Sequence, residues 1–216
     1  MKGFALLLQF MICLMFFSCA NNNPGEETLL LYTRASSVYR EGRYEEAASM
    51  LSAERNFLPS LVLRGKAQFF TGNDKDAEQT LRRALSLRPG NIEAGLYMAR
   101  LEREKGNIND ARQLIEKILA DDPQNIRALR FAAQLSRDIG PEGEAASLAF
   151  LDQAAEASAE TALVFIDRAR SHWINGNVSS AVEDLQRARA LLPENSPMIN
   201  SLYGLESIIA ARAGDL

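Results

Sequence analysis

Residues 72–89 read GNDKDAEQTLRRALSLRP, and residues 106–123, one period later, read GNINDARQLIEKILADDP. In both stretches an alanine follows the glycine by five residues and a proline follows it by seventeen. Two further copies keep these spacings, so the repeated residues are Gly42, Gly72, Gly106 and Gly176; Ala47, Ala77, Ala111 and Ala181; and Pro59, Pro89, Pro123 and Pro193. Gly140 and Ala145 mark a degenerate fifth copy, with Ala157 in place of the proline. Much of the chain is therefore a tandem repeat.

Each repeated residue has a structural reason. A glycine just after a helix adopts the left-handed conformation that closes the helix. The asparagines after three of these glycines are expected to cap the following helix: Asn73, Asn107 and Asn177. The alanine lets two helices approach closely, and the proline ends the second helix. Each repeat is thus predicted to be a helix pair, and no segment has a strand pattern.

A period of about 34 residues with these positions resembles the tetratricopeptide repeat, a pair of antiparallel helices. The resemblance covers residues 29–195 and implies an all-α, right-handed solenoid of about five helix pairs, near 28–57, 58–91, 92–125, 126–161 and 162–195. It implies a small residue in each first helix, at Ala35, Gly65, Ala99, Ala133 and Ala169.

Two features at the ends of the repeat region modify this prediction. The first two glycines are only 30 residues apart, which predicts that the first helix of the second repeat lacks about one turn. Residues 196–216 contain one more amphipathic pattern. We expect a capping helix there, because a solenoid must cover its last apolar face.

The N-terminus has the pattern of an export signal. Lys2 precedes an apolar run over residues 4–17, and Ser18 stands before Cys19. This resembles the lipobox of bacterial lipoproteins and implies a signal peptide at 1–18, lipid on Cys19 and a polar tether at 19–27. An uncleaved signal anchor and an ordinary cleaved leader are the alternatives, and all three place the body outside the cytoplasm. Ala20 favours the outer membrane, with the body facing the periplasm.

Composition limits the chemistry. The 24 basic and 28 acidic residues give a net charge of −4, which argues against nucleic acid as a partner. Both cysteines, Cys13 and Cys19, lie in the leader region, and His172 is the one histidine. We therefore expect no enzyme activity, no metal site and no cofactor. The acidic residues next to one another, such as Asp121 and Asp122, read as solvated faces.

Partner binding is expected on the concave face. In the resembled family, first-helix positions 2, 5, 9 and 12 line the groove, and here they include Lys66, Arg100, Arg103, Arg130 and Arg170 with Tyr39, Phe69 and Trp173. Aromatic and arginine side chains are common anchors of protein interfaces. The alternative is that the cations are helix formers on an exposed face and that the aromatics pack between repeats.

The resulting functional hypothesis is a membrane-anchored scaffold of the cell envelope that binds a partner protein or peptide in its groove. A second hypothesis is an accessory lipoprotein of a transport system that holds a small hydrophobic or anionic molecule. An enzyme comes third, and would need His172 in a cleft beside a carboxylate.

Overall fold

The computed structural model describes residues 24–158 and 161–214, and every regular element over those residues is a helix. Cys19 and the rest of the predicted leader lie outside the described residues. In chain order the elements are α2 (Glu26–Arg40), α3 (Tyr44–Met50), α4 (Leu58–Phe70), α5 (Asp74–Leu87), α6 (Ile92–Glu104), α7 (Ile108–Asp121), α8 (Ile126–Arg137), the short 3-10 helix η1 (Pro141–Gly143), α9 (Glu144–Ala157), α10 (Ala162–Ile174), α11 (Val178–Leu191) and α12 (Ile199–Gly214).

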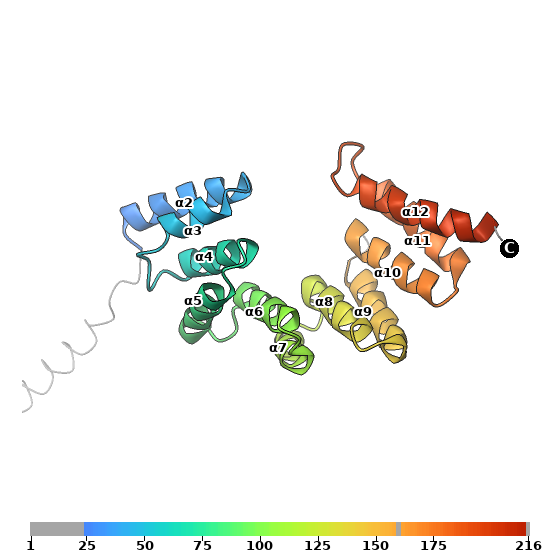
Figure 1. The fold of residues 1–216 in the computed structure, drawn as a ribbon, viewed down its shortest axis with the longest axis horizontal. Helices are drawn as coiled ribbons and strands as arrows, with labels where there is room; N and C mark the ends of the chain where they lie inside the picture. The colour runs from blue at the N-terminus through green and yellow to red at the C-terminus, as the bar shows by residue number, and fades with distance from the viewer. Residues whose placement is uncertain (1–23, 159–160, 215–216) are drawn as a thin grey trace, which may run out of the picture.

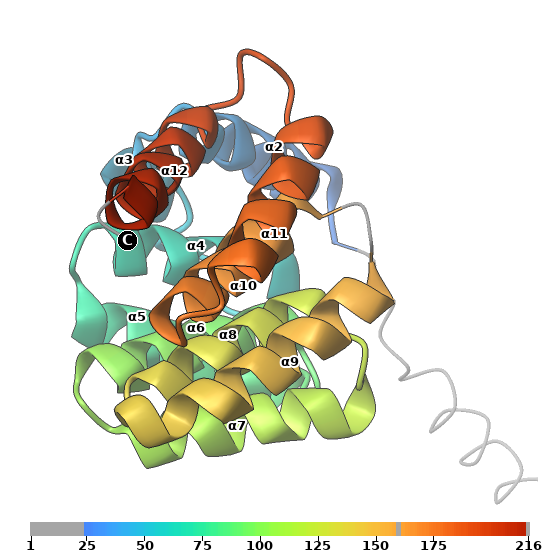
Figure 2. The same ribbon diagram turned by 90° about the vertical axis from the view of Figure 1, so that its right-hand side faces the viewer.

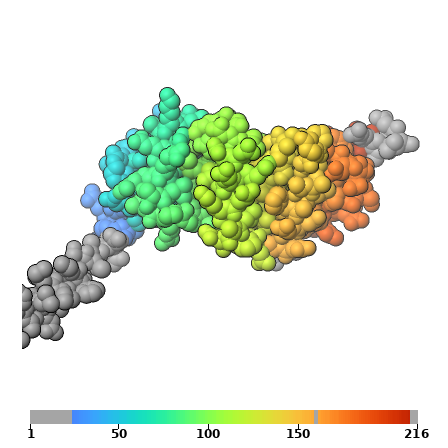
Figure 3. All heavy atoms as spheres, turned by 90° about the horizontal axis from the view of Figure 1, so that it is seen from below, coloured from blue at the N-terminus to red at the C-terminus, as the bar shows by residue number. Residues whose placement is uncertain are grey.

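Consecutive helices pack into pairs, and the pairs follow one another along an arch (Figure 1). The first helices of neighbouring pairs also contact each other. For example, α4 contacts α6, and α8 contacts α10. Viewed along the long axis, the helix pairs follow a curved path (Figure 2). From below, the repeats form adjacent bands in chain order (Figure 3). The predicted all-α solenoid of five helix pairs with a capping helix, α12, is confirmed.

Four of the repeated glycines close the first helices as expected. Gly42, Gly72, Gly106 and Gly176 have φ angles between 71° and 83°. At the second of these turns, the Asn73 N–H donates to the Gln68 carbonyl at 2.9 Å and the Gly72 N–H donates to the Phe69 carbonyl at 3.1 Å. These two bonds form a Schellman motif, which satisfies carbonyls at the end of the helix and turns the chain back.

The expected capping role of the asparagine after each glycine is wrong. Asn73, Asn107 and Asn177 make no side-chain bond to the helix that follows, because their ψ angles of 59–65° lie outside the extended region that a capping residue adopts. Two other asparagines cap instead. Asn91 and Asn125, with ψ angles of 104° and 99°, accept the N–H groups of the third helical residues of α6 and α8.

The short first repeat has its missing residues in a different helix from the one predicted. α4 has 13 residues, like α6 and α10, whereas α3 has only 7 and the other second helices have 14. Pro59 does not end a helix, since it lies in the first turn of α4. The N–H groups of a first turn have no helical partner, so proline is tolerated there as well as after a helix.

The fifth copy is shifted in register. Ala145 is exposed, and Ser147 occupies the buried position that alanine fills in the other repeats. The reason is the 3-10 turn after Gly140, directly before α9 begins. It adds two residues between the glycine and the buried position of the second helix. Ala77, Ala111 and the expected small residues of the first helices are all buried, which confirms their predicted packing.

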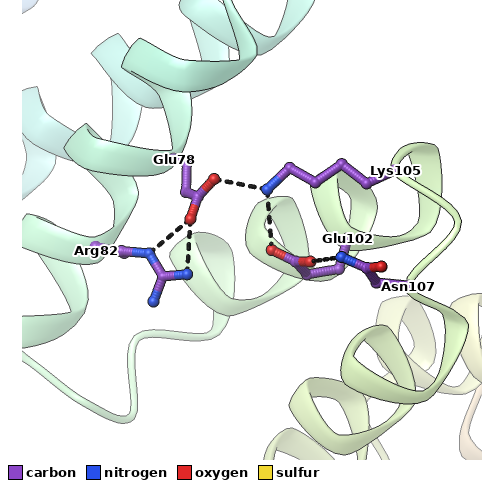
Figure 4. A network of polar contacts seen from close by, with 5 residues as sticks. All are labelled: Glu78, Arg82, Glu102, Lys105 and Asn107. Carbon is purple, nitrogen blue, oxygen red and sulfur yellow. Dashed lines mark hydrogen bonds and ion pairs between the residues drawn. The ribbon is translucent and has the colours of Figure 1, made fainter.

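Charged networks also join neighbouring repeats (Figure 4). Lys105 Nζ lies 2.6 Å from Glu78 Oε2 on α5 and 3.1 Å from Glu102 Oε1 on α6. Glu78 also accepts hydrogen bonds from Arg82, and Glu102 accepts one from Asn107. These contacts link α5 to the turn between α6 and α7, so successive pairs are held by polar bonds as well as by apolar packing.

Candidate binding groove

A basic pocket lies between the first helices of the third, fourth and fifth repeats. It has a volume of about 190 Å³ and its walls come from α6, α8 and α10. The lining residues are Leu96, Arg100, Arg127, Arg130, Phe131, Gln134, Arg137, Asp167 and Arg170. Five of these nine side chains are arginine and one is acidic, so the pocket carries a formal excess of four positive charges.

Two of the five arginines are neutralised by acids. Arg130 Nη2 lies 2.8 Å from Asp167 Oδ2 on the next repeat. Arg127 forms an ion pair with Glu93, which projects from α6. These pairs fix the positions of two guanidinium groups and reduce the local charge, but they leave the pocket cationic.

The other three arginines of the pocket make no ion pair within the described chain. Arg100 lies over the Tyr97 ring, 4.9 Å from its centroid. Arg137 donates to the Ser147 hydroxyl at 2.9 Å, and its burial lowers the pKa of the guanidinium. Arg170 is exposed at the rim. Guanidinium groups bind carboxylates with two parallel hydrogen bonds, so this part of the pocket is suited to an external anion.

Lys66 lies in a different part of the concave face. Its Nζ is 2.6 Å from Glu93 Oε1 and 5.3 Å from the ring centroids of both Tyr39 and Tyr97. Burial acts to raise the pKa of Glu93, but the hydrogen bonds from Arg127 and Lys66 hold it below its ordinary value. Glu93 therefore stays ionised and links the second, third and fourth repeats.

The aromatic side chains predicted for the groove mainly fill the spaces between repeats. Tyr39 and Phe69 belong to a ring cluster that also contains Tyr44, Phe70 and Tyr97, with centroid separations of 4.8–6.2 Å. Burial raises the pKa of Tyr39.

Trp173, at the other end of the concave face, packs against the apolar core formed by α10, α11 and α12. These contacts agree with the alternative considered for the aromatics, packing between repeats, and their role in partner binding stays a prediction.

The structure places three of the five predicted groove cations, Arg100, Arg130 and Arg170, around one pocket. Lys66 lines a separate pocket, and Arg103 is paired with Asp138 at 2.5 Å. The acidic partners were missed by sequence reasoning, although a signal exists. Opposite charges on neighbouring first helices are separated by roughly one period, as in the pairs Arg127–Glu93, Arg103–Asp138 and Arg130–Asp167, which are 34, 35 and 37 residues apart.

His172 has no evident catalytic setting. Its Nε2 lies 3.9 Å from Asp184 Oδ2, but both oxygens of Asp184 accept hydrogen bonds from Arg168. Among residues 24–158 and 161–214 there is no cluster of three or more possible metal ligands. Nor does the described part contain a helix with the length and apolar character needed to cross a bilayer.

Comparison with known proteins identifies the repeat. Two family models of the tetratricopeptide repeat match the chain, one over residues 32–92 and the other over residues 71–135. The chain therefore contains tetratricopeptide repeats, and proteins built from this repeat are generally non-enzymatic scaffolds that bind other proteins. A search of curated protein sequences found no significant match.

Solved structures with the same fold come from several bacteria. A tetratricopeptide repeat protein from Parabacteroides merdae is 22% identical, with a TM-score of 0.68, over 81% of this chain and 69% of that chain. A thermophilic repeat protein from Thermus thermophilus is 15% identical, with a TM-score of 0.68, over 85% and 97%. PilF from Pseudomonas aeruginosa is 12% identical, with a TM-score of 0.69, over 86% and 84%. At these identities the likeness supports the fold alone.

Proposed function

We propose that this chain is a scaffold of the bacterial cell envelope whose concave groove binds an acidic segment of a partner protein. The observation that carries the proposal is the pocket of five arginines and one aspartate between α6, α8 and α10. Arg100, Arg137 and Arg170 form no ion pair with a described acid, although Asp138, Glu144 and Asp167 act on Arg137 from a distance. An acidic segment would supply the missing negative charge and approach faster at low salt.

The dimensions of the pocket favour a protein segment over an enclosed small molecule. Its volume of about 190 Å³ is below the range of roughly 300–1,000 Å³ of typical small-molecule sites. Its walls are mostly charged, which disfavours a hydrophobic ligand. A peptide can place one acidic side chain in the pocket and continue along the groove toward the separate pocket that Lys66 lines.

The groove is tested by reversing two charges that form no ion pair with the described residues. Arg100→Glu combined with Arg170→Glu should abolish capture of envelope proteins, measured by pull-down and quantitative mass spectrometry. Arg103 is left unchanged because its reversal would oppose Asp138 and disturb folding. The matched control is Lys75→Glu with Lys117→Glu, two exposed changes on the second helices α5 and α7.

We expect the control variant to capture the same proteins as the wild type. Capture by the wild type should weaken as salt rises, because the Debye length falls from about 10 Å at 0.1 M to about 3 Å at 1 M. Equal loss in both double variants, or capture that survives both, would reject the pocket as the binding surface.

We also propose that Cys19 carries a lipid that holds the scaffold on the periplasmic side of the outer membrane. The support is the sequence pattern of residues 1–19 and the apolar run before the cysteine. Cys19→Ser should eliminate incorporation of labelled fatty acid and leave either a soluble chain or an uncleaved precursor. Unchanged labelling of the variant would contradict the anchor without affecting the groove proposal.

A further inference from the structure

A second basic cavity lies outside the groove, among α3, α4 and α5. Its volume is about 420 Å³, and its charged lining consists of Arg55, Arg64, Arg83 and Asp76. It lies beside the short helix α3, where the other repeats have a second helix twice as long. Arg64 and Gln68 are one helical turn apart on α4, so they share the face of α4 that looks into this cavity.

Arg64 is a half-buried cation that bonds only to neutral oxygens among the described residues. Its Nη1 donates to the carbonyls of Leu51, Ser52 and Glu54 at 3.0–3.2 Å, and its Nη2 donates to the Thr80 hydroxyl at 3.1 Å. The Nε of Arg64 is buried and has no hydrogen-bond partner.

No neighbouring acid forms an ion pair with Arg64, although Asp76 and Glu54 favour its charge from a distance. Gln68 Oε1 is also buried without a partner. Arg55 and Arg83 bond to backbone carbonyls and to the Asn56 side chain. Three guanidinium groups therefore meet at one cavity with Asp76 as the one acid in its lining.

The last repeat shows how the same position is neutralised elsewhere in this chain. Arg168 stands eight residues before Gly176, as Arg64 stands eight before Gly72, and Asp184 stands eight after Gly176, as Thr80 does after Gly72. Arg168 donates to both oxygens of Asp184, at 2.8 and 2.7 Å.

A second carboxylate completes the site around Arg168. Arg168 Nη1 donates to Asp152 Oδ1 at 2.9 Å. Asp152 stands five residues after the buried Ser147, just as Ser52 stands five residues after the buried Ala47. Arg168 thus lies between two carboxylates, whereas Arg64 has a threonine and a serine at the equivalent positions and a cavity beside it.

We infer that the cavity among α3, α4 and α5 is a binding site for an external carboxylate, which bonds to Arg64 where Asp184 bonds to Arg168. The short α3 leaves the space, and Arg55 and Arg83 add favourable charge at the entrance. The carboxylate belongs either to a free small acid or to an aspartate or glutamate of a bound protein. The site is separate from the arginine pocket of the groove and does not depend on it.

The test is the thermal midpoint of the full chain in acetate or succinate, compared with chloride at equal ionic strength. A ligand that binds the folded state raises the midpoint with its concentration. We expect this rise in the wild type and its loss in Thr80→Asp, which supplies the carboxylate internally and has the higher midpoint in chloride. Thr80→Asn, which adds no charge, should keep the response to succinate.

A reciprocal variant provides the matched control. Asp184→Thr should lower the midpoint because it leaves Arg168 with only one of its two carboxylate partners. Arg64→Met should abolish the original response, which keeps the test decisive if Thr80→Asp does not fold. The groove variant Arg100→Glu with Arg170→Glu should respond like the wild type, so the two proposals fail separately.

Three results would overturn the inference. They are a wild type that does not respond to carboxylates, a response that persists in both Thr80→Asp and Arg64→Met, and a larger response to phosphate than to succinate.

A peptide with one central glutamate, compared with its glutamine version, distinguishes a carboxylate of a bound protein from a free small acid. Binding at least tenfold tighter than acetate assigns the site to a partner's side chain, and equal binding assigns it to a free acid.

Discussion

At the scale of single residues, two glycines inside first helices show how closely each helix pair packs. A Cβ on Gly65 would lie 2.7 Å from both Cγ and Cδ2 of Leu81, so the leucine would have to move as a whole. A Cβ on Gly95 would lie 3.1 Å from the terminal Cδ1 of Ile118, a methyl that can shift slightly.

Alanine at these two positions should therefore have opposite effects. Alanine in place of glycine stabilises a helix by about 1 kcal/mol, and overpacking costs about 1–3 kcal/mol. We predict that Gly95→Ala raises the free energy of unfolding by up to about 1 kcal/mol and that Gly65→Ala lowers it by about 1–2 kcal/mol. Urea denaturation measures both, and equal effects would contradict the assigned packing.

Glu93 gives a prediction of pH dependence. Its pKa in the folded protein is below the ordinary value of 4.5 because it accepts hydrogen bonds from Arg127 and Lys66, although its burial opposes this shift. A depressed pKa adds stability that is complete above 4.5 and is lost as the pH falls through the folded pKa.

Glu93→Gln should therefore lower the free energy of unfolding by about 1–2 kcal/mol at pH 7, and the difference from the wild type should shrink below pH 4.5. The control is Glu104→Gln, an exposed change on the same helix. A difference that stays constant down to acid pH would show that the charge of Glu93 is not what stabilises the fold.

The sequence predicted correctly the residues whose role depends on the local backbone. It failed for residues whose contacts depend on long side chains or on the dihedral angles of a loop. The small residues and the closing glycines follow from helix geometry, which the period makes visible. The partners of Lys66 and Arg130 lie on other repeats, so the superhelical stacking selects which acids of the neighbouring repeats they reach. Asn73 failed as a cap because its ψ angle is set by the glycine turn before it.

At the scale of elements, α3 explains why the missing residues of the first repeat were assigned to the wrong helix. Proline stands both after helices and in their first turns, so Pro59 could be aligned with Pro89 although it begins α4. The chain between α3 and α4 replaces two helical turns. Arg64 bonds to its carbonyls, and Glu54 Oε1 accepts the N–H groups of Arg55, Asn56 and Phe57 at 2.9–3.0 Å.

Glu54 should therefore be the residue that fixes the loop in front of α4. Burial acts to raise its pKa, and the three backbone N–H groups hold it below the ordinary value. We predict that Glu54→Ala lowers the free energy of unfolding by about 1–2 kcal/mol and speeds hydrogen exchange in residues 55–61. Glu116→Ala, an exposed change on α7, should have little effect, and a similar loss in both variants would contradict the role of Glu54.

At the scale of the whole molecule, the fold was predictable because every repeat contacts mainly its neighbours. The sequence period is therefore enough to specify how the helix pairs stack along the chain. The basic pocket was predictable only in part. Its five arginines come from three helices that follow the period, but their net charge depends on acids that vary between repeats. The cavity beside α3 arises from a departure from the period and therefore carries no repeat signal.

The same stacking of each repeat on its neighbours predicts how far the destabilising effect of a substitution extends along the chain. Leu202 of α12 is fully buried against the core formed with α10 and α11, at the end of the stack. Leu202→Ala removes contacts worth about 2–5 kcal/mol. In a solenoid this loss should stay near the end, because each repeat interacts only with adjacent repeats.

Hydrogen exchange should therefore become faster in α11 and α12 and remain unchanged in α4–α6. Ile208→Ala, an exposed change on the same helix, should leave both regions as they are. Uniformly faster exchange across all repeats after Leu202→Ala would instead show that the chain unfolds as one cooperative unit and that α12 supports the whole stack.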